Sequence, residues 1–439
     1  MRKIKFLAVA ILCSLTFFGC KETNTEVEIA IYNLQIQLAF PADYEASTTD
    51  TRTVVLKDNS GIEYTANSDA EGIATFRVPT GIYEASSAFS TSVNGVAYSL
   101  NAIKTGINVT STWDETSSVE LLFVQTEAGA LLIKELYIGG ITKDDGGSYV
   151  YDKYVTLYNN SDVDLTYKNF CLGMVNPYNS HATNYDYVDG VLAYENEGIS
   201  LAGTGIWHYD QLTVKAREEI TIALNGAIDH TITYPSSVDL SKADYATYDI
   251  DVYTSTSYYP APSENIPTEN YFDAILWGLG TAWPLSTICP AFFIFQVEDG
   301  SVTDYFARED INRYYHTYTS LAFLRKEVPN EWVLDAIEVF TTKSDENSKR
   351  LTADVDAGSV MHTNTMGYTL YRNVDQTATE AIAENEGKLV YSYSGGTADS
   401  TDPSGIDAEA SRANGATIIY KDTNNSTNDF HERAVSALK

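Results

Sequence analysis

The segment LQIQLAF at residues 34–40 alternates apolar with polar or small side chains. This period of two is typical of a β-strand that is buried on one face only. Residues 119–123 repeat the pattern. Between them, the segment SDAEGIATFRVPTGIYEAS (residues 68–86) places turn residues on both sides of an alternating run, which predicts a β-hairpin. Residues 27–125 are therefore expected to form a compact β domain.

A second β region follows the segment QTEAGA (residues 125–130), which we expect to be a hinge. Strands are predicted within residues 131–140, 153–159, 212–224 and 290–297. Short helices are predicted at 377–386 and at 429–439. The expected fold is mainly β, with two immunoglobulin-like β-sandwich domains. The second, residues 131–439, should carry long loop insertions and a few short helices.

Several segments resemble known families. Residues 68–86 resemble carboxypeptidase-regulatory or Cna-B modules, which implies that 27–125 is a spacer or stalk. KYVTLYNNSDVDL (residues 153–165) and KDTNNSTNDF (residues 421–430) resemble the opening and the end of a lamin-tail-type domain. The whole of 131–439 resembles an uncharacterised family of Bacteroidetes surface lipoproteins, and this implies a location and an architecture but no activity. The matching segments are GSYVYDKYVTLYNNSD (147–162), MVNPYNSHATN (174–184), ALNGAIDH (223–230), SYYPAPSENIPT (257–268), AWPLSTICPAFFIF (282–295), LTADVDAGSV (351–360) and KDTNNSTNDF.

The N-terminus has the organisation of a secretory signal. Arg2, Lys3 and Lys5 precede an apolar run at residues 6–18, followed by Gly19 and Cys20. That run is too short for a membrane span, which needs roughly 20 residues, and it fits a signal peptide of residues 1–19. Cys20 resembles the lipidated cysteine of a bacterial lipobox. This implies a lipid anchor on Cys20 and a tether at 20–26; the alternative is a secreted protein with an incidental cysteine.

Residues 21–28 (KETNTEVE) follow the predicted cleavage site and are acidic. They resemble the export tag of Bacteroidetes lipoproteins, which implies an outer-membrane protein exposed at the cell surface. Losing three positive charges with the leader would take the formal net charge from −32 to −35. Such a surface repels phosphate backbones, so DNA and RNA are not expected partners.

No catalytic signature is present in the sequence. It has no HExxH, GxSxG, CxxC or phosphate-binding loop, and its six histidines are scattered. We therefore expect no catalytic residue, no cofactor and no metal. Residues 354–358 and 422–429 are rich in side-chain oxygens, which are the ligands that calcium prefers. Asx turns, in which these side chains bond their own backbone, are the preferred explanation.

The two cysteines of the mature chain beyond the anchor are Cys171 and Cys289. A disulfide is permitted outside the cytosol. Two separately buried thiols are the alternative, and the sequence favours this second arrangement.

An aromatic insertion is the candidate binding site. Tyrosines, aspartates and prolines gather between residues 244 and 271, and two tryptophans follow. Aromatic rings on loops of a rigid β scaffold suit a sugar face or a protein partner. The alternative is a long loop that packs down on its own rings. The candidate ligand-binding residues are Tyr245, Tyr248, Tyr253, Tyr258, Tyr259, Trp277 and Trp283.

The anchor, the spacer-like first domain and the loop-rich second domain predict a non-catalytic accessory protein. Its expected roles are capture of a glycan or other small ligand, or docking on a TonB-dependent transporter. A structural or adhesive envelope protein is the alternative, and a surface hydrolase with an unfamiliar carboxylate site is the third hypothesis.

Overall fold

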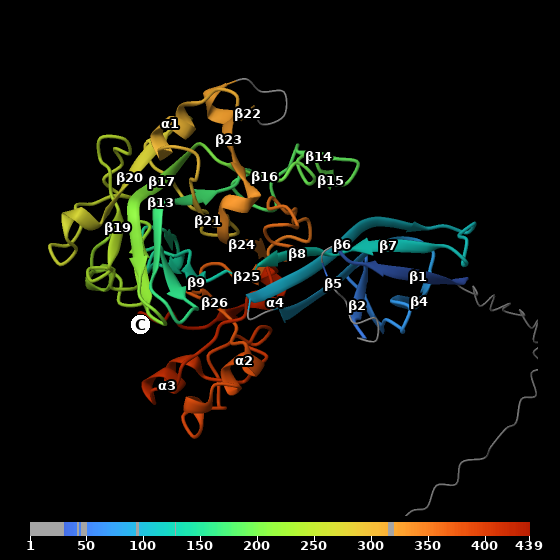
Figure 1. The fold of residues 1–439 in the computed structure, drawn as a ribbon. Helices are drawn as coiled ribbons and strands as arrows, with labels where there is room; N and C mark the ends of the chain where they lie inside the picture. The colour runs from blue at the N-terminus through green and yellow to red at the C-terminus, as the bar shows by residue number, and fades with distance from the viewer. Residues whose placement is uncertain (1–29, 42–43, 45–50, 94–95, 128, 315–319) are drawn as a thin grey trace, which may run out of the picture.

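The computed structural model describes residues 30–41, 44, 51–93, 96–127, 129–314 and 320–439. Figure 1 shows a smaller body of strands β1–β8 beside a larger body formed by the rest of the chain. The predicted signal peptide and tether, with Cys20, lie outside the described residues.

The smaller body is a β-sandwich. Its strands are β1 (Ile31–Ala39), β2 (Thr53–Asp58), β3 (Glu63–Asn67), β4 (Ile73–Pro79), β5 (Gly81–Val93), β6 (Val96–Val109), β7 (Ser118–Leu122) and β8 (Val124–Glu127). One sheet has the order β4-β1-β7 and the other β3-β2-β5-β6-β8. The apolar face of β1 packs with Phe76, Leu100 and Leu121 in one core between the sheets. The period-two pattern thus predicted the buried face correctly.

The predicted hairpin at residues 68–86 is wrong in its pairing. Strand β4 pairs with β1, whereas β5 pairs with β2 and β6 in the other sheet. Both strands contribute side chains to the shared core, Phe76 and Val78 from β4 and Tyr83 and Ala85 from β5. The link at residues 79–81 therefore carries the chain across the sandwich, because each strand finds a better partner in its own sheet.

The larger body is built on a 12-stranded sheet. In spatial order its strands are β25 (Val360–His362), β24 (Val333–Thr341), β21 (Ala291–Gln296), β13 (Leu165–Met174), β17 (Gly205–Val214), β20 (Tyr271–Leu276), β19 (Tyr245–Thr247), β18 (Glu219–Ala223), β12 (Tyr154–Asn159), β9 (Leu131–Tyr137), β26 (Thr369–Arg372) and β27 (Phe430–Arg433).

The sheet folds over on itself around the main core. Strand β9 contacts β24 although seven strands separate them in the sheet order. The Ile133 N–H donates to Asp335 Oδ2 at 2.6 Å across this contact. The enclosed core includes Val155 from one half of the sheet and Phe292 and Ile337 from the other. The prediction of a mainly β fold with β-sandwich domains is confirmed.

Strand β21 explains why one continuous apolar run was visible in the sequence. Phe292 and Ile294 point into the main core, and Phe293 and Phe295 point into a second cluster on the other face. A strand that is buried on both faces loses the apolar-polar alternation.

Short elements cover the outer faces of the large sheet. They are β10 (Ile141–Thr142), β11 (Ser148–Tyr149), β14 (Tyr187–Val188), β15 (Val191–Leu192), β16 (Ile199–Ala202), β22 (Asn312–Tyr314), β23 (Leu324–Pro329), α1 (Val302–Ala307), α2 (Gln376–Glu380), α3 (Ala408–Ala413) and α4 (Ser426–Asp429), with 3-10 turns at His230–Ile232, Thr268–Asn270, Leu321–Phe323, Asn330–Trp332 and Ala383–Asn385. None of the helices among the described residues has the length and apolar content of a membrane span.

Two local predictions need correction. Residues 429–439 were expected to be helical, but residues 430–433 form β27, which pairs with β26 and buries Phe430. The run at 212–224 is two strands, because Arg217 adopts a positive φ of 58° in the turn between β17 and β18. The helix expected at 377–386 corresponds to α2 and the 3-10 turn that follows it.

The junction between the two bodies is bonded rather than open. Strand β8 pairs with β6, so residues 125–127 of the expected hinge belong to the first sandwich. The Gly129 N–H donates to Asp422 Oδ2 at 2.6 Å, and the Asn101 side chain donates to the Thr423 carbonyl. The first domain is therefore fastened to the C-terminal segment of the second.

Strand pairing defines two ends of the larger body. Leu131, which receives the chain from the first domain, pairs with Asn159 at one end. The other end, called here the loop end, collects long connections from many strands. The strand residues at that end are Tyr137, Tyr154, Met174, Gly205, Ala223, Thr247, Leu276, Ala291 and Thr341.

Candidate ligand-binding face

The loop end brings together four segments that are far apart in the sequence. They are the connections after β9, β13, β18 and β19, and they contain residues 147–153 of GSYVYDKYVTLYNNSD and most of MVNPYNSHATN, ALNGAIDH and SYYPAPSENIPT. The Gly226 N–H donates to the Tyr258 carbonyl at 2.9 Å, which joins the third segment to the fourth. Segments that resemble one family in the sequence thus meet on one surface.

Tyrosine rings from these loops form a continuous row, called here the tyrosine face. Centroids of Tyr234 and Tyr149 lie 4.5 Å apart, those of Tyr149 and Tyr151 5.6 Å, and those of Tyr151 and Tyr258 4.9 Å. The last two contacts are edge-to-face, a favoured geometry for aromatic pairs. Tyr178, which is 39% exposed, lies close enough to Tyr258 for the two hydroxyls to interact electrostatically, and we include it in the face. The face consists of Tyr149, Tyr151, Tyr178, Tyr234 and Tyr258.

The tyrosine face offers both apolar rings and polar groups to solvent. Tyr149, Tyr151, Tyr234 and Tyr258 are half-buried. Within the described part of the chain, the hydroxyls of Tyr151, Tyr234 and Tyr258 have no hydrogen-bond partner. A fixed ring with a wet hydroxyl can stack on an apolar ligand face and bond to its rim.

Gly226 and His230 hold one end of the tyrosine face. The Gly226 carbonyl accepts from His230 Nε2 at 2.6 Å, so the proton of the neutral ring is on Nε2. His230 Nδ1 then accepts from the Tyr149 hydroxyl at 2.7 Å. Burial lowers the pKa of His230, which keeps this tautomer neutral. The histidine therefore positions Tyr149 from behind and is not itself part of the exposed surface.

A buried lysine lies beneath the middle of the face. Lys153 is 1% exposed, and its Nζ lies 5.6 Å from the centroid of the Tyr258 ring. The amine donates to the Val150 carbonyl at 2.7 Å and to Asn225 Oδ1 at 3.4 Å. Burial lowers the pKa of Lys153 to about 7, although Asp152 acts in the opposite direction. Lys153 ties the loops to the sheet and supports the Tyr258 ring.

Three of the predicted binding residues belong to the main core, which corrects that prediction. Tyr253, Tyr259 and Trp283 are each 1% exposed. Tyr259 accepts from the Trp283 N–H at 3.0 Å, and Trp283 Nε1 donates to the Gly205 carbonyl at 2.9 Å. These rings pack the 248–290 loops onto the sheet, as the alternative interpretation expected.

The other four predicted binding residues are half-buried. Tyr258 is in the tyrosine face, as described above. Tyr245 packs edge-to-face against Tyr209 at 5.2 Å, and Tyr248 against Tyr271 at 5.5 Å. Trp277 stacks on Phe306 at 5.0 Å and donates to the Gly203 carbonyl. Tyr245, Tyr248 and Trp277 therefore contact other rings and not those of the tyrosine face. Of the seven predicted binding residues, Tyr258 is in the tyrosine face.

Sequence reasoning missed four members of the face: Tyr149, Tyr151, Tyr178 and Tyr234. Each lies outside the aromatic insertion at 244–271, in a segment that is not as rich in tyrosine as the insertion. The available signal was the family resemblance, since 147–162 and 174–184 were matching segments. Their convergence depends on strand order, which the sequence does not display.

Cys171 and Cys289 are free thiols in the structure, so a disulfide between them is not formed. Both are fully buried, but Cys289 belongs to the main core and Cys171 to the cluster on the opposite face of the sheet. The sheet itself separates the two sulfurs.

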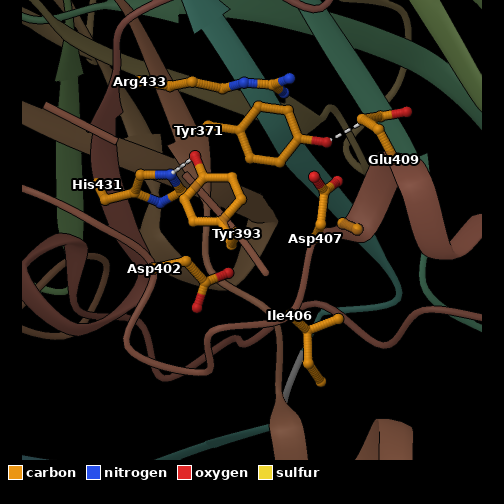
Figure 2. Close-up of a pocket in the computed structure, with 9 residues that line it drawn as sticks. Tyr371, Tyr393, Asp402, Ile406, Asp407, Glu409, His431 and Arg433 are labelled. Carbon is orange, nitrogen blue, oxygen red and sulfur yellow. Dashed lines mark hydrogen bonds between the residues drawn. The ribbon is translucent and has the colours of Figure 1, made fainter. Parts of the chain in front are cut away.

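A second polar cluster lies under the helical segment between β26 and β27. Figure 2 shows Tyr393 and His431 pointing toward each other, with Tyr371 and Glu409 beside them. His431 Nδ1 donates to Asn373 Oδ1 at 2.7 Å, so Nε2 accepts from the Tyr393 hydroxyl. Burial, with help from Arg433, lowers the pKa of His431 to about 3. The cavity here is only about 10 Å³, room for one water molecule and not for a substrate.

The same cluster contains a buried ion network. Lys134, 1% exposed, donates to Glu219 and Glu409 at 2.7 Å each. Burial acts to raise the pKa of Glu409, but Lys134 and the Tyr371 hydroxyl outweigh it and lower that pKa to about 2. The network joins β9 and β18 to α3, so we assign it to the fold.

The two oxygen-rich segments are engaged within the protein. Asp356 accepts from the backbone N–H groups of Glu338, Gly358 and Ser426. Asp422 and Asp429 lie 3.6 and 3.9 Å from a guanidinium nitrogen of Arg372. Their oxygens serve turns and an internal cation, in line with the Asx-turn explanation.

Fold and surface together define a β-sandwich protein with a preformed aromatic face on its loops. A family model described as protein of unknown function (DUF4876) matches residues 216–437, and the chain belongs to this family. The predicted membership of an uncharacterised family is confirmed. A search of curated proteins found no match.

One similar crystal structure is that of a DUF4876 family protein from Bacteroides thetaiotaomicron VPI-5482 at 2.50 Å resolution. The identity is 17%, the TM-score is 0.53, and the match covers 93% of this chain and 98% of that chain. This likeness supports the fold and carries no statement about activity.

Proposed function

We propose that this chain is a non-catalytic, lipid-anchored accessory protein of the outer membrane that captures a ligand on the tyrosine face. The observation that carries the proposal is the row of half-buried tyrosines on bonded loops at the loop end. The loop end lies opposite the end of the sheet that receives the chain from the first domain. Cys20 would hold the other side of the molecule on the membrane, at the cell surface.

A glycan is the ligand class that suits this face. Sugar rings present apolar C–H faces and hydroxyl rims, which match stacked tyrosine rings and their hydroxyls. Two ionisable side chains close to the face, Lys153 and His230, lie behind the rings, and their nitrogens are bonded internally. The surface is therefore suited to holding a ligand rather than to transferring protons to it.

The bonded loops favour capture by a preformed surface. Asn179 Oδ1 accepts from Ser286 Oγ at 2.5 Å, and Asn364 donates to the Thr287 carbonyl at 2.8 Å. A surface that is ordered before binding loses less conformational freedom when the ligand arrives.

A TonB-dependent transporter is the proposed recipient of the ligand.

Glycan binding tests the proposal directly. The soluble Cys20→Ser mature chain should bind polysaccharides in affinity electrophoresis. The Tyr151→Ala/Tyr258→Ala variant should lose about tenfold or more in affinity, because each removes a stacking ring. Tyr151→Phe/Tyr258→Phe keeps the rings and should lose less. Tyr391→Ala, which removes a tyrosine that is 58% exposed and lies in the segment between β26 and β27, is the matched control.

Thermal unfolding of each variant checks that the fold is kept. If folded Tyr151→Ala/Tyr258→Ala retains the affinity of the wild-type protein, the face is not the binding site. Recovery of a TonB-dependent transporter in mild-detergent pull-downs from outer membranes would support the docking role, and repeated recovery of the protein alone would count against it.

A further inference from the structure

A cavity of about 340 Å³ lies between the two domains. Strands β6 and β7 of the first sandwich form one side, and residues 195–196 and 353–357 of the second domain form the other. Its apolar walls are Ile103, Leu122, Ala353 and Ala357. Small-molecule sites typically start at about 300 Å³ and often lie between domains. The cavity is separate from the tyrosine face.

One polar group that lines this cavity has a missing partner. Asn101 is 4% exposed, and its Nδ2 donates to the Thr423 carbonyl across the domain junction. Its Oδ1 is buried and has no hydrogen-bond partner among the described residues. An unsatisfied buried acceptor is costly, so a ligand that donates to Asn101 Oδ1 would remove that cost.

Carboxylates supply the remaining polar lining. Glu120, Glu195 and Asp354 line the cavity, against the single cation Lys104. Burial raises the pKa of Glu195 and Asp354 adds to that effect, whereas the Ala353 N–H that donates to Glu195 and the charge of Lys349 act in the opposite direction. Burial likewise raises the pKa of Asp354. Two partly desolvated carboxylates in one cavity are stabilised when a cation enters.

The lining favours an organic cation over a metal ion. Within the described part of the chain, no three His, Cys, Asp or Glu side chains converge in a metal-binding arrangement. The volume exceeds what one ion needs, and the apolar walls would lie against hydrocarbon. A ligand that combines an alkyl chain with charged N–H donors suits the apolar walls, the unpaired Asn101 Oδ1 and the carboxylates.

We propose that this interdomain cavity binds a small aliphatic amine or guanidine. The charged group bonds to Glu195 and Asp354, a second N–H donates to Asn101 Oδ1, and the alkyl chain lies against Ile103 and Leu122. Because both domains line the cavity, the occupant also bridges them.

Calorimetric titration of the soluble mature chain with agmatine tests this site, since agmatine carries a guanidinium and an amine on an alkyl chain. We expect saturable binding, and Glu195→Gln/Asp354→Asn should weaken it about tenfold or more by removing both charges. The matched control Asp345→Asn/Glu346→Gln neutralises two exposed carboxylates that do not line the cavity and should bind like the wild-type protein.

Three results would overturn the proposal: no saturable binding of agmatine, equal affinity in the two double variants, or binding of calcium chloride alone with none of agmatine. Thermal unfolding confirms that each variant is folded. Tyr151→Ala/Tyr258→Ala should keep agmatine binding, so this result does not depend on that of the glycan test.

Discussion

Gly226 has a positive φ, and there is no room for a Cβ at this position, so both features require glycine. Its φ is +56°, and an added Cβ would lie 2.5 Å from His230 Cε1 and 2.5 Å from the Tyr151 carbonyl oxygen. Gly226→Ala should therefore lower the free energy of unfolding by about 2 kcal/mol or more and displace Tyr149 and Tyr151. Urea unfolding measures the first effect and glycan affinity the second.

The control for Gly226→Ala is Gly300→Ala, at a φ of +77° with no atom within 4 Å of the added Cβ. This variant has the backbone strain without the clash, so it should cost only about 1 kcal/mol and leave binding unchanged. Equal losses in the two variants would show that packing around Gly226 is loose.

His431 should make the second domain less stable in mild acid. Its pKa is about 3 in the folded protein, because burial and Arg433 disfavour the charged ring, whereas an unfolded histidine titrates near 6.5. Below pH 6.5 the unfolded chain binds a proton that the folded chain does not. Stability is therefore lost as the pH falls toward 3, and the loss is about 2 kcal/mol between pH 7.5 and 5.

Urea unfolding of the wild-type protein and His431→Gln at these two pH values measures this loss. Gln keeps a donor and an acceptor for Asn373 and Tyr393 but does not titrate, so its pH dependence should be smaller by that amount. Other groups titrate equally in both proteins and cancel. The exposed His181 provides the control His181→Gln, which should behave like the wild-type protein.

Tyrosine is the residue type for which the sequence was least informative. Tyr253 and Tyr259 fill the core, Tyr258 is half-buried in the tyrosine face, and all three lie within seven residues. A ring with one polar atom satisfies both environments, so composition alone cannot separate them. Aliphatic positions such as Leu34 and Ile36 carry no such ambiguity, and their burial was predicted.

At the scale of elements, Arg372 fastens the folded-over sheet. From β26 it pairs with Asp335 on β24, and Nε donates to the Ile133 carbonyl of β9 at 2.7 Å. It also lies near Asp422 and Asp429, and its side chain is 1% exposed. The guanidinium thus faces three buried carboxylates where the two halves of the sheet meet, and its single positive charge offsets part of theirs.

Arg372→Met should lower the free energy of unfolding by about 3–5 kcal/mol, because it leaves those carboxylates without a cation. Hydrogen exchange should show lost protection at β9, β24 and β26, where local opening becomes easier. The control Arg308→Met removes an arginine whose side chain is 40% exposed and should cost much less stability than Arg372→Met. Comparable losses in both variants would contradict the role assigned to Arg372.

Strand existence was predictable, whereas strand partners were not. The apolar patterns of residues 34–40, 153–159 and 290–297 predict strands without reference to any other part of the chain. Pairing of β4 with β1 rather than with β5 depends on a core assembled from distant segments. For the same reason, the sequence showed the family resemblance of the four segments at the loop end but did not show that they lie together.

At the scale of the molecule, the chain runs from the predicted anchor toward the tyrosine face. Strand β1 begins at Ile31 and ends at Ala39, whose carbonyl accepts from the Phe123 N–H next to the domain junction. Nine residues of extended chain span about 30 Å, so the side of the first sandwich on which β1 begins is well separated from that junction. The second domain then places the tyrosine face at the end opposite the junction.

This arrangement predicts which surface of the anchored protein reaches the medium. Ile232 is 82% exposed and lies two residues from Tyr234. Ile232→Cys should react with a membrane-impermeant maleimide on intact cells, because Cys20 would hold the opposite side of the molecule on the outer membrane. The wild-type protein supplies the background, since Cys171 and Cys289 are 0% exposed and Cys20 would be lipidated. Adding Cys20→Ser should release the protein from the membrane fraction. Labelling only after lysis would place the face in the periplasm, and a membrane-bound Cys20→Ser variant would remove the anchor on which this orientation depends.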